Sequence, residues 1–135
     1  MISNLTAKWY PYALGLMRLM IGFMFLQHGV QKLGYLEGHE RVFPELRWFA
    51  MALELLGGIL IALGIFTRPV AFLLSGQMAV AYFLSHAPNG FWQILNGGER
   101  AYLYCFLFLF IVTAGPGNFS VDGWFAKKFG ARSWM

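Results

Sequence analysis

Four long apolar runs, separated by short polar breaks, constrain this chain more than any other feature. They cover approximately residues 11–33, 48–67, 70–87 and 99–114. A helix of about 20 apolar residues crosses the ~30 Å hydrocarbon core of a bilayer. Hydrophobic residues make up 59% of the chain and charged residues 12%, whereas soluble domains have roughly 45–50% and about 25%. The sequence therefore predicts one integral membrane domain over residues 1–135, in contact with the lipid bilayer.

The fourth run needs a separate argument, because its aromatic residues recur at every second position, as in a β-strand. They are Tyr102, Tyr104, Phe106, Phe108 and Phe110. The residues between them are apolar too, so the run has no polar face, and a lone strand in lipid would leave its backbone groups unpaired. We therefore expect a helix here as well. The predicted fold class is all-α, a four-helix transmembrane bundle.

Local signals mark the expected helix ends. Pro11 suits the first turn of a helix, because its missing N–H has no partner to lose there. Asn96 and Glu99 have the spacing of a capping box at the start of the fourth helix. The Gly-Pro-Gly sequence at 115–117 is a strong stop signal at the end of that helix.

The distribution of lysines and arginines predicts the orientation in the membrane. The side of the two termini carries Lys8, Arg68, Lys127, Lys128 and Arg132, and the other side carries Lys32, Arg41, Arg47 and Arg100. This small excess favours N and C termini in the cytoplasm. The basic residues form no stripe or motif of a nucleic-acid-binding protein. Attraction to anionic lipid headgroups explains the net charge of +4 better, and no nucleic-acid partner is expected.

Two ionisable residues lie inside the apolar runs. Arg18 is about two turns into the first run, and Glu54 is about two turns into the second. Each costs roughly 2.5–3.5 kcal/mol to insert, so each needs a partner or a polar cavity. Two interpretations stand. One is an ion pair between Arg18 and Glu54 that joins the two helices, and the other is a polar site for a ligand head group or a proton.

Glycines mark the faces on which these two helices are expected to meet. Gly15, Gly22 and Gly29 lie at heptad spacing on the arginine-bearing face of the first run. Gly57 and Gly58 follow the glutamate of the second run by three and four positions. Because small residues let membrane helices approach closely, we expect the two faces to pack together.

A second polar group gathers where the third run ends and the fourth begins. Because the helices alternate in direction, His28, His86 and Glu99 share one depth. They could bind a metal together, the two histidines could be the axial ligands of a haem, or the histidines could hydrogen-bond to the loops. We favour hydrogen bonding of the histidines to the loops and assign no metal. The uncharged, aromatic loop 88–98 either folds over this end as a lid or lies at the membrane interface.

Several segments, taken in order, are similar to one known family. They are Arg18, FLQHGVQKL (Phe25–Leu33), ELLGGILIALGIFTRPVA (Glu54–Ala71), MAVAYFLSHAPNGFWQILNGGERAYLYCF (Met78–Phe106) and GPGNFSVD (Gly115–Asp122). On these motifs the chain resembles the DoxX family of small four-helix bacterial membrane proteins. The resemblance implies a multi-pass protein of the bacterial inner (plasma) membrane. It also implies ligand-binding positions at Arg18, His28, Glu54, His86 and Glu99.

The resemblance leads to a first hypothesis of function. The family takes its name from a subunit associated with an archaeal complex that oxidises thiosulfate or quinol, and relatives are linked to redox and sulfur metabolism. By that resemblance the protein is a redox-associated subunit that contacts a quinone-like or other small lipid-soluble ligand. Any oxidoreductase activity would need a partner or a bound cofactor such as a quinone, because the side chains here cannot carry electrons.

The second hypothesis belongs to a different class, a non-catalytic membrane scaffold or small-molecule carrier. Four short helices make a small bundle, which argues against a monomeric transporter built from two repeats. Under either hypothesis a homo-oligomer or a larger membrane complex is therefore favoured.

Overall fold

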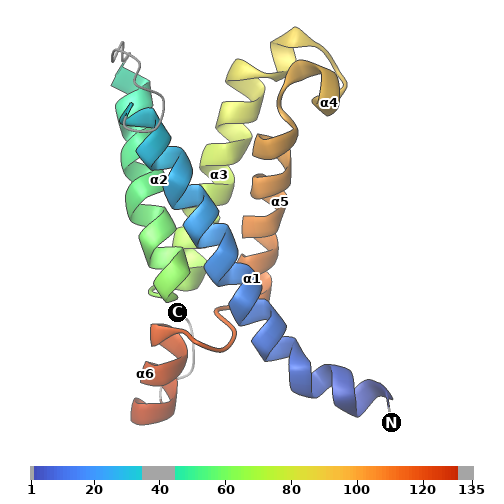
Figure 1. Ribbon diagram of the computed structural model, residues 1–135, viewed down its shortest axis with the longest axis vertical. Coiled ribbons are helices and arrows are strands. Elements are labelled where there is room, and N and C mark those ends of the chain that lie inside the picture. The colour runs from blue at the N-terminus through green and yellow to red at the C-terminus, as the bar shows by residue number, and fades with distance from the viewer. Residues whose placement is uncertain (1, 35–44, 131–135) are drawn as a thin grey trace.

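The computed structural model describes residues 2–34 and 45–130, and every regular element within them is a helix (Figure 1). The elements are α1 (Ile2–Lys32), α2 (Glu45–Leu63), α3 (Thr67–Ser85), η1 (Ala87–Asn89), α4 (Gln93–Asn96), α5 (Glu99–Ala114) and α6 (Val121–Phe129). The prediction of an all-α fold is confirmed over the described residues. The alternating aromatic residues of the fourth run lie in helix α5.

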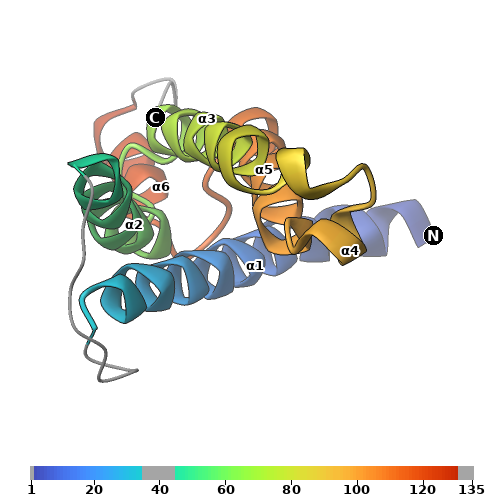
Figure 2. The same ribbon diagram turned by 90° about the horizontal axis from the view of Figure 1, so that it is seen from above.

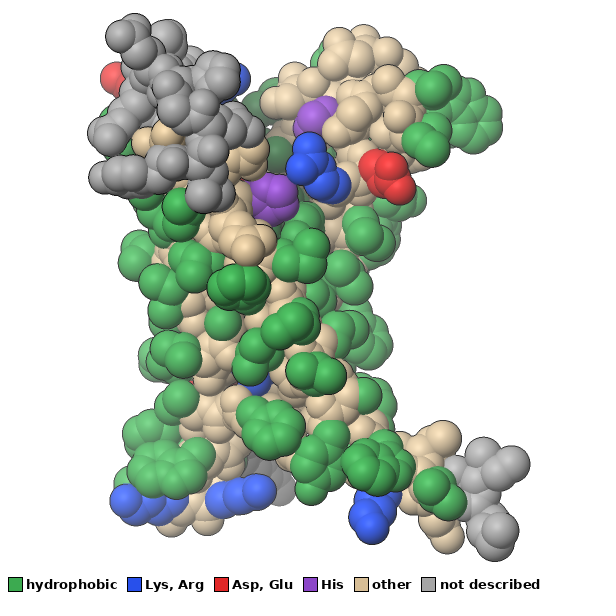
Figure 3. All heavy atoms as spheres, in the orientation of Figure 1, with side chains coloured by type: hydrophobic (Ala, Val, Ile, Leu, Met, Phe, Trp, Pro, Cys, Tyr) green, Lys and Arg blue, Asp and Glu red, His purple; other side chains and the backbone are tan. Residues whose placement is uncertain are grey.

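Three helices are long and apolar enough to cross a membrane. They span Asn4–Lys32, Glu45–Leu63 and Thr67–Asn89. Hydrophobic side chains cover the middle of the molecule, and charged side chains gather at its two ends (Figure 3). Helix α5 has 16 residues and is about 24 Å long at 1.5 Å per residue, shorter than the ~30 Å hydrocarbon core. A fourth crossing and cytoplasmic termini stay predictions, and Arg41 and Arg132, used to predict the orientation, lie outside the described residues.

The long helices form two pairs, α1 with α2 and α3 with α5, whereas α2 and α3 share fewer contacts. The pairs lie closest together near α6 and separate toward α4 (Figures 1 and 2). We call these two ends of the bundle the α6 end and the α4 end. The core between the pairs consists of Ile21, Phe25, Ile61, Ala71, Leu74, Met78, Ala101, Tyr104, Phe108 and Ile111.

Helices α1 and α2 touch through their backbones at two glycines, as the sequence predicted. A Cβ atom added at Gly58 would lie 2.7 Å from the backbone nitrogen of Leu26 and 2.9 Å from its Cα. Gly22 faces the backbone of α2 in the same way, and Gly29 packs against the side chain of Leu55. Only glycine fits where two backbones approach this closely.

The other two glycines of the helix faces that were expected to pack together have different neighbours. Gly15 contacts the backbone of Asn118, in the loop before α6, and Gly57 contacts the side chain of Leu74 on α3. The glycine face of α1 therefore holds both α2 and the chain that follows α5.

The predicted start of the first helix is wrong. Helix α1 begins at Ile2, so Pro11 lies inside it rather than in its first turn. The turns before Pro11 extend away from the bundle (Figure 1), and the carbonyl of Pro11 accepts a hydrogen bond of 2.9 Å from the amide of Asn118. A proline inside a helix removes one backbone hydrogen bond, but it does not end this helix.

The predicted capping box at α5 is also wrong. The residue before the helix is Gly98, and no side chain caps the helix. Asn96 is buried instead, where its side chain accepts a 2.8 Å hydrogen bond from the amide of Gly98 and donates at 2.9 Å to the carbonyl of Gly90. The amide side chain of Asn96 therefore fixes the fold of the loop, a role that Asn performs in many turns.

Candidate functional site

Arg18 organises the α6 end of the bundle. Its side chain is fully buried, with 0% exposed. It donates at 2.5–3.3 Å to five backbone carbonyls, those of Ile61, Ala62, Pro116, Asn118 and Phe119. Two of these carbonyls belong to the last turn of α2, where helix carbonyls lack partners and the helix dipole is negative. The planar guanidinium, with five donors, suits this arrangement.

The predicted ion pair between Arg18 and Glu54 is therefore wrong. Arg18 leans toward the α6 end, where carbonyls of α2 and of the loop before α6 surround it. The partner of Glu54 is Lys32, whose Nζ lies 2.5 Å from Oε1 of the carboxylate. A ligand-binding role for Arg18 stays a prediction, and its observed contacts give it a structural one.

Two further charged side chains satisfy helix ends near Arg18. Asp122, which the sequence analysis did not single out, accepts hydrogen bonds from the amides of Phe66 and Thr67 at 3.0 and 2.8 Å. Its carboxylate thereby caps the N-terminus of α3, where the helix dipole is positive. Arg68 donates to the carbonyls of Val112 and Thr113 at the end of α5. The α6 end is thus a structural network that joins α1, α2, α3, α5 and α6.

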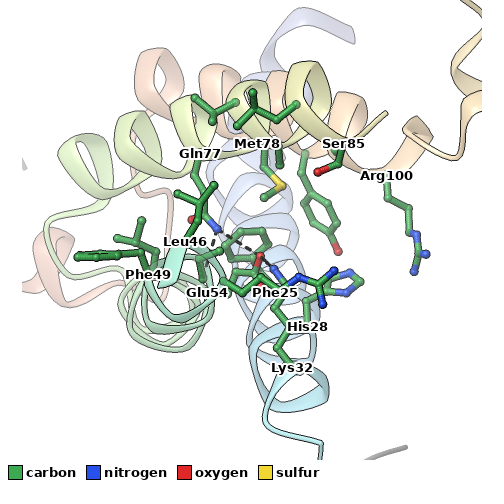
Figure 4. A pocket seen from close by; sticks show the side chains of 18 of the residues that line it. Phe25, His28, Lys32, Leu46, Phe49, Glu54, Gln77, Met78, Ser85 and Arg100 are labelled. Atoms are coloured by element: carbon green, nitrogen blue, oxygen red, sulfur yellow. Dashed lines mark hydrogen bonds and ion pairs between the residues drawn. The ribbon is translucent and has the colours of Figure 1, made fainter. Parts of the chain in front are cut away.

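The α4 end holds a cavity of about 780 Å³ between α1, α2, α3 and α5 (Figure 4). Small-molecule sites commonly have about 300–1,000 Å³. Three of the five predicted site residues line it, namely His28, Glu54 and His86. Arg18 and Glu99 do not, although Arg100, next to Glu99, does.

Glu54 is the most deeply buried charged group of the cavity, with 2% of the residue exposed. Its Oε1 accepts from Lys32 at 2.5 Å and from Nε2 of Gln77 at 3.2 Å (Figure 4). The Lys32 side chain is 38% exposed, so this ion pair runs from the surface into the bundle. Helices α1, α2 and α3 each contribute one of these three groups.

Three buried polar atoms around the cavity have no hydrogen-bond partner among the described residues. They are Oε2 of Glu54, Oε1 of Gln77 and the hydroxyl of Tyr104, and all three residues line the cavity. A buried polar atom without a partner destabilises a protein by about 1–3 kcal/mol, and native proteins contain few of them. Three such atoms at one cavity therefore indicate a place where a ligand or solvent completes the hydrogen bonds.

Aromatic rings form one wall of the cavity. The ring of Phe25 lies 5.4 Å from that of Tyr104 and 4.9 Å from that of Phe108, measured between centroids. The imidazole of His28 stands perpendicular to the Tyr104 ring at 5.7 Å. Such edge-to-face pairs are favourable arrangements of aromatic rings, and they give the cavity an apolar wall beside its polar groups.

The metal site of His28, His86 and Glu99, one of the alternatives that the sequence left open, is not formed by the described residues. Among residues 2–34 and 45–130, no three His, Cys, Asp or Glu side chains lie close enough to hold a metal ion. Glu99 is exposed and outside the cavity, whereas Arg100, the next residue of the helix and so on a different face, lines it. Nδ1 of His86 lies 3.3 Å from the carbonyl of Asn96, as expected for a histidine that hydrogen-bonds to the loop.

Of loop 88–98, Gly97 alone lines the cavity. The large apolar side chains of the loop are Phe91, Trp92, Ile94 and Leu95, all exposed, and none of them lines the cavity. Of the two interpretations of loop 88–98, these positions support the one in which the loop lies at the membrane interface.

The cavity also reaches the outside of the bundle between α2 and α3. The exposed apolar side chains on its wall are Leu46, Phe49 and Leu53 of α2 and Leu73, Val80 and Leu84 of α3. Gln77 bridges this side of the cavity, since its Nε2 donates to the carbonyl of Ala50 at 3.2 Å as well as to Glu54. In a membrane, this opening faces lipid.

Sequence reasoning missed Gln77 and Tyr104 as site residues. Gln77 is an uncharged polar residue in the middle of the third run, and that interruption was a signal. Tyr104 is one of several aromatic residues at the start of α5, and nothing in the sequence distinguishes it from its neighbours.

A chain whose described elements are all helices, three of them long and apolar enough to cross a membrane, is a membrane protein, and its cavity with a buried carboxylate is a candidate small-molecule site. The chain belongs to the DoxX family, whose profile, described as DoxX, matches residues 13–87. It is 41% identical to an uncharacterized protein of Haemophilus influenzae over 93% of this chain and 99% of the relative. It is 28% identical to an uncharacterized membrane protein of Mycobacterium tuberculosis over 82% of this chain and 80% of the relative. No solved structure matches the chain.

Proposed function

We propose that this DoxX-family protein binds a small lipid-soluble molecule in the cavity at the α4 end. The observation that carries the proposal is a cavity of about 780 Å³ that combines a buried carboxylate, Glu54, with an opening lined by lipid-facing side chains. The polar head of the ligand contacts Glu54, Gln77 and Tyr104. Its apolar body lies against the aromatic wall and toward the opening between α2 and α3.

A redox-associated role is the finer form of this proposal. A quinone-like ring suits an aromatic wall, and the hydroxyl of Tyr104 has a proton to donate to a ring oxygen. His28, Glu54 and His86 line the cavity as the ligand-binding residues of this form. Electron transfer would come from the bound molecule or a partner subunit, because these side chains do not carry electrons. A homo-oligomer or a larger complex in the bacterial inner membrane, with four crossings and cytoplasmic termini, belongs to the same proposal.

The alternative is a carrier or scaffold that binds the ligand without any redox reaction. The same cavity supports it, because an opening toward lipid between α2 and α3 lets a hydrophobic molecule enter and leave sideways. The two forms differ in the identity of the ligand rather than in the position of the site.

The test is to identify what the protein retains on purification. The chain is extracted from bacterial membranes in mild detergent, its visible spectrum is recorded, and bound lipids and quinones are identified by mass spectrometry. We expect one lipid-soluble compound at near-stoichiometric amounts, lost in Glu54→Gln and in His28→Ala. Glu45→Gln is the matched control, since Glu45 lies on the same helix, is exposed and lies outside the cavity.

Each outcome has a distinct meaning. A bound quinone supports the redox-associated form, and a different neutral lipid supports the carrier. A Soret band in the visible spectrum would instead indicate a haem bound by His28 and His86. Retention of the same compounds by wild type, Glu54→Gln and Glu45→Gln alike would contradict a binding role for the cavity.

A further inference from the structure

We infer that the cavity selects an uncharged ligand whose head donates a hydrogen bond, an alcohol or a phenol, over molecules that only accept one. This inference rests on the proposed function and specifies the ligand class of the same site; within the redox-associated form it favours the reduced quinol, which carries hydroxyl groups, over the quinone, which only accepts. It follows from which atoms of Glu54 and Gln77 are already bonded and which are not.

The side-chain amide of Gln77 has a defined orientation. Its two nearby polar partners, the carbonyl of Ala50 and Oε1 of Glu54, are both acceptors at 3.2 Å. The NH₂ group must therefore face them, which leaves the carbonyl oxygen Oε1 as the atom without a partner. An amide oxygen accepts hydrogen bonds and cannot donate them.

The carboxylate of Glu54 presents a second acceptor. Its Oε1 is occupied by Lys32 and Gln77, and its Oε2 is buried without a partner among the described residues. Because Glu54 and Gln77 are hydrogen-bonded to each other, the two unsatisfied acceptors belong to adjacent side chains on α2 and α3. A ligand that brings only carbonyl or ether oxygens would place acceptor against acceptor there, whereas a hydroxyl group donates to either oxygen.

The charges that line the cavity exclude a cationic head, and the unpartnered oxygens of Glu54 and Gln77 exclude an anionic head from the polar centre, although exposed Arg47 and Arg100 attract anions. Among the described residues, Lys32, Arg47 and Arg100 line it together with the carboxylate of Glu54. An ammonium head would meet three positive charges, and the carboxylate that could hold it is already paired with Lys32 at 2.5 Å. An anionic head would meet the carboxylate oxygen and the amide oxygen at the polar centre of the site. Two charges of the same sign repel each other strongly in a low-dielectric site.

The hydroxyl of Tyr104 completes the pattern. It is buried and without a partner among the described residues, and a phenolic hydroxyl both donates and accepts. An alcohol or phenol can therefore donate to Glu54 or Gln77 and accept from Tyr104 through one oxygen atom. The nearby rings of Phe25 and His28 favour a ligand with a planar, apolar body.

The experiment compares four probes of one shape. They are para-hexylphenol, its methyl ether, para-hexylbenzylamine and para-hexylbenzoate, titrated against the full chain in lipid nanodiscs with empty nanodiscs as the partition blank. We expect the phenol to bind about tenfold or more tightly than the ether, as a hydrogen bond to a charged acceptor implies, and more tightly than either ion. Glu54→Gln should reduce the ratio of phenol to ether affinity to about twofold or less, and Glu45→Gln should leave it unchanged.

A second variant keeps the inference testable if Glu54→Gln does not fold. Gln77→Met keeps the length of the side chain and removes only the amide, and it should lower the ratio of phenol to ether affinity several-fold. Equal affinity of wild type for phenol and ether, or tighter binding of the benzoate or the benzylamine, overturns the inference and leaves the proposed function intact. Absence of binding by all four probes, together with no co-purified ligand, overturns both.

Discussion

Replacing Gly58 by alanine adds a single methyl group at the place where α1 and α2 touch. The new Cβ would lie 2.7 Å from the backbone nitrogen of Leu26, 2.9 Å from its Cα and 3.0 Å from the carbonyl oxygen of Gly22. All three atoms belong to the backbone of α1, so no side-chain rotation relieves the overlap. The two helices must move apart.

The magnitude follows from the size of that overlap. Non-bonded carbon atoms rest about 3.5–4.0 Å apart, so α1 and α2 must separate by roughly 1 Å at this point. A gap of about 0.5–1 Å removes a quarter to a half of the dispersion energy of each contact along the seam. Overpacking of this kind costs about 1–3 kcal/mol, and we expect the free energy of unfolding of Gly58→Ala to fall by that amount.

Gly76→Ala is the matched control, because it is the same chemical change inside another helix. Gly76 is exposed on α3, and an added Cβ there has no atom within 4 Å. Alanine in an open helical position stabilises by about 0.5–1 kcal/mol relative to glycine. The free energies of unfolding of the two variants should therefore differ by about 1.5–4 kcal/mol.

The assay is equilibrium unfolding in mixed micelles with a rising fraction of sodium dodecyl sulfate, followed by circular dichroism. Wild type, Gly58→Ala and Gly76→Ala are compared under one lipid and detergent composition. Equal stability of Gly58→Ala and wild type would refute the argument from backbone contact. A similar loss in both variants would show that the effect does not come from the contact between α1 and α2.

Three further predictions concern the α6 end. Arg18→Met should lower the free energy of unfolding by about 3 kcal/mol or more, because buried carbonyls lose a charged donor. Lys127→Met, at an exposed position, is the control, and equal losses of stability in the two variants would contradict the structural role of Arg18. Asp122→Ala should lower the free energy of unfolding by about 1 kcal/mol, because α3 loses its N-terminal cap. Hydrogen exchange at the Thr67 amide should accelerate, and an unchanged exchange rate would contradict the capping role of Asp122. A cysteine in place of Lys127, in a Cys105→Ser background, should react with an impermeant maleimide only in opened cells, and labelling of intact cells would contradict cytoplasmic termini.

Much of the fold could be predicted from the sequence because its signals are local. The runs that form α1, α2 and α3 are long and apolar enough to identify membrane helices, and the requirement for backbone hydrogen bonds predicted α5 as a helix. Gly22 and Gly58 predicted the seam because only small residues permit that approach. The start of α1 was predicted wrongly, since Pro11 suits a first turn but is also tolerated inside a long helix.

The candidate site was harder to predict because its partners are distant in the sequence. Arg18 and Glu54 were expected to pair as the two ionisable residues of neighbouring runs. The sequence does not show that the end of α2 and the loop before α6 offer Arg18 five carbonyls. Lys32 was counted among the basic residues of the side away from the termini but was not connected with Glu54. An amide such as Gln77 carries too weak a hydropathy signal to identify a binding residue by itself.

Because Arg18 donates only to backbone oxygens among the described residues, the side chains around it are largely free to vary. A substitution at Ala62 or Asn118 keeps the carbonyl, and therefore the hydrogen bond. An inserted or deleted residue between 115 and 120 displaces these carbonyls from the guanidinium, whatever side chain it brings. In a library of variants, positions 116 and 118 should accept many amino-acid types and the segment few changes in length. Gly115 and Gly117 should persist, because both have positive φ and a Cβ there would meet Arg68 or the backbone of Gly15.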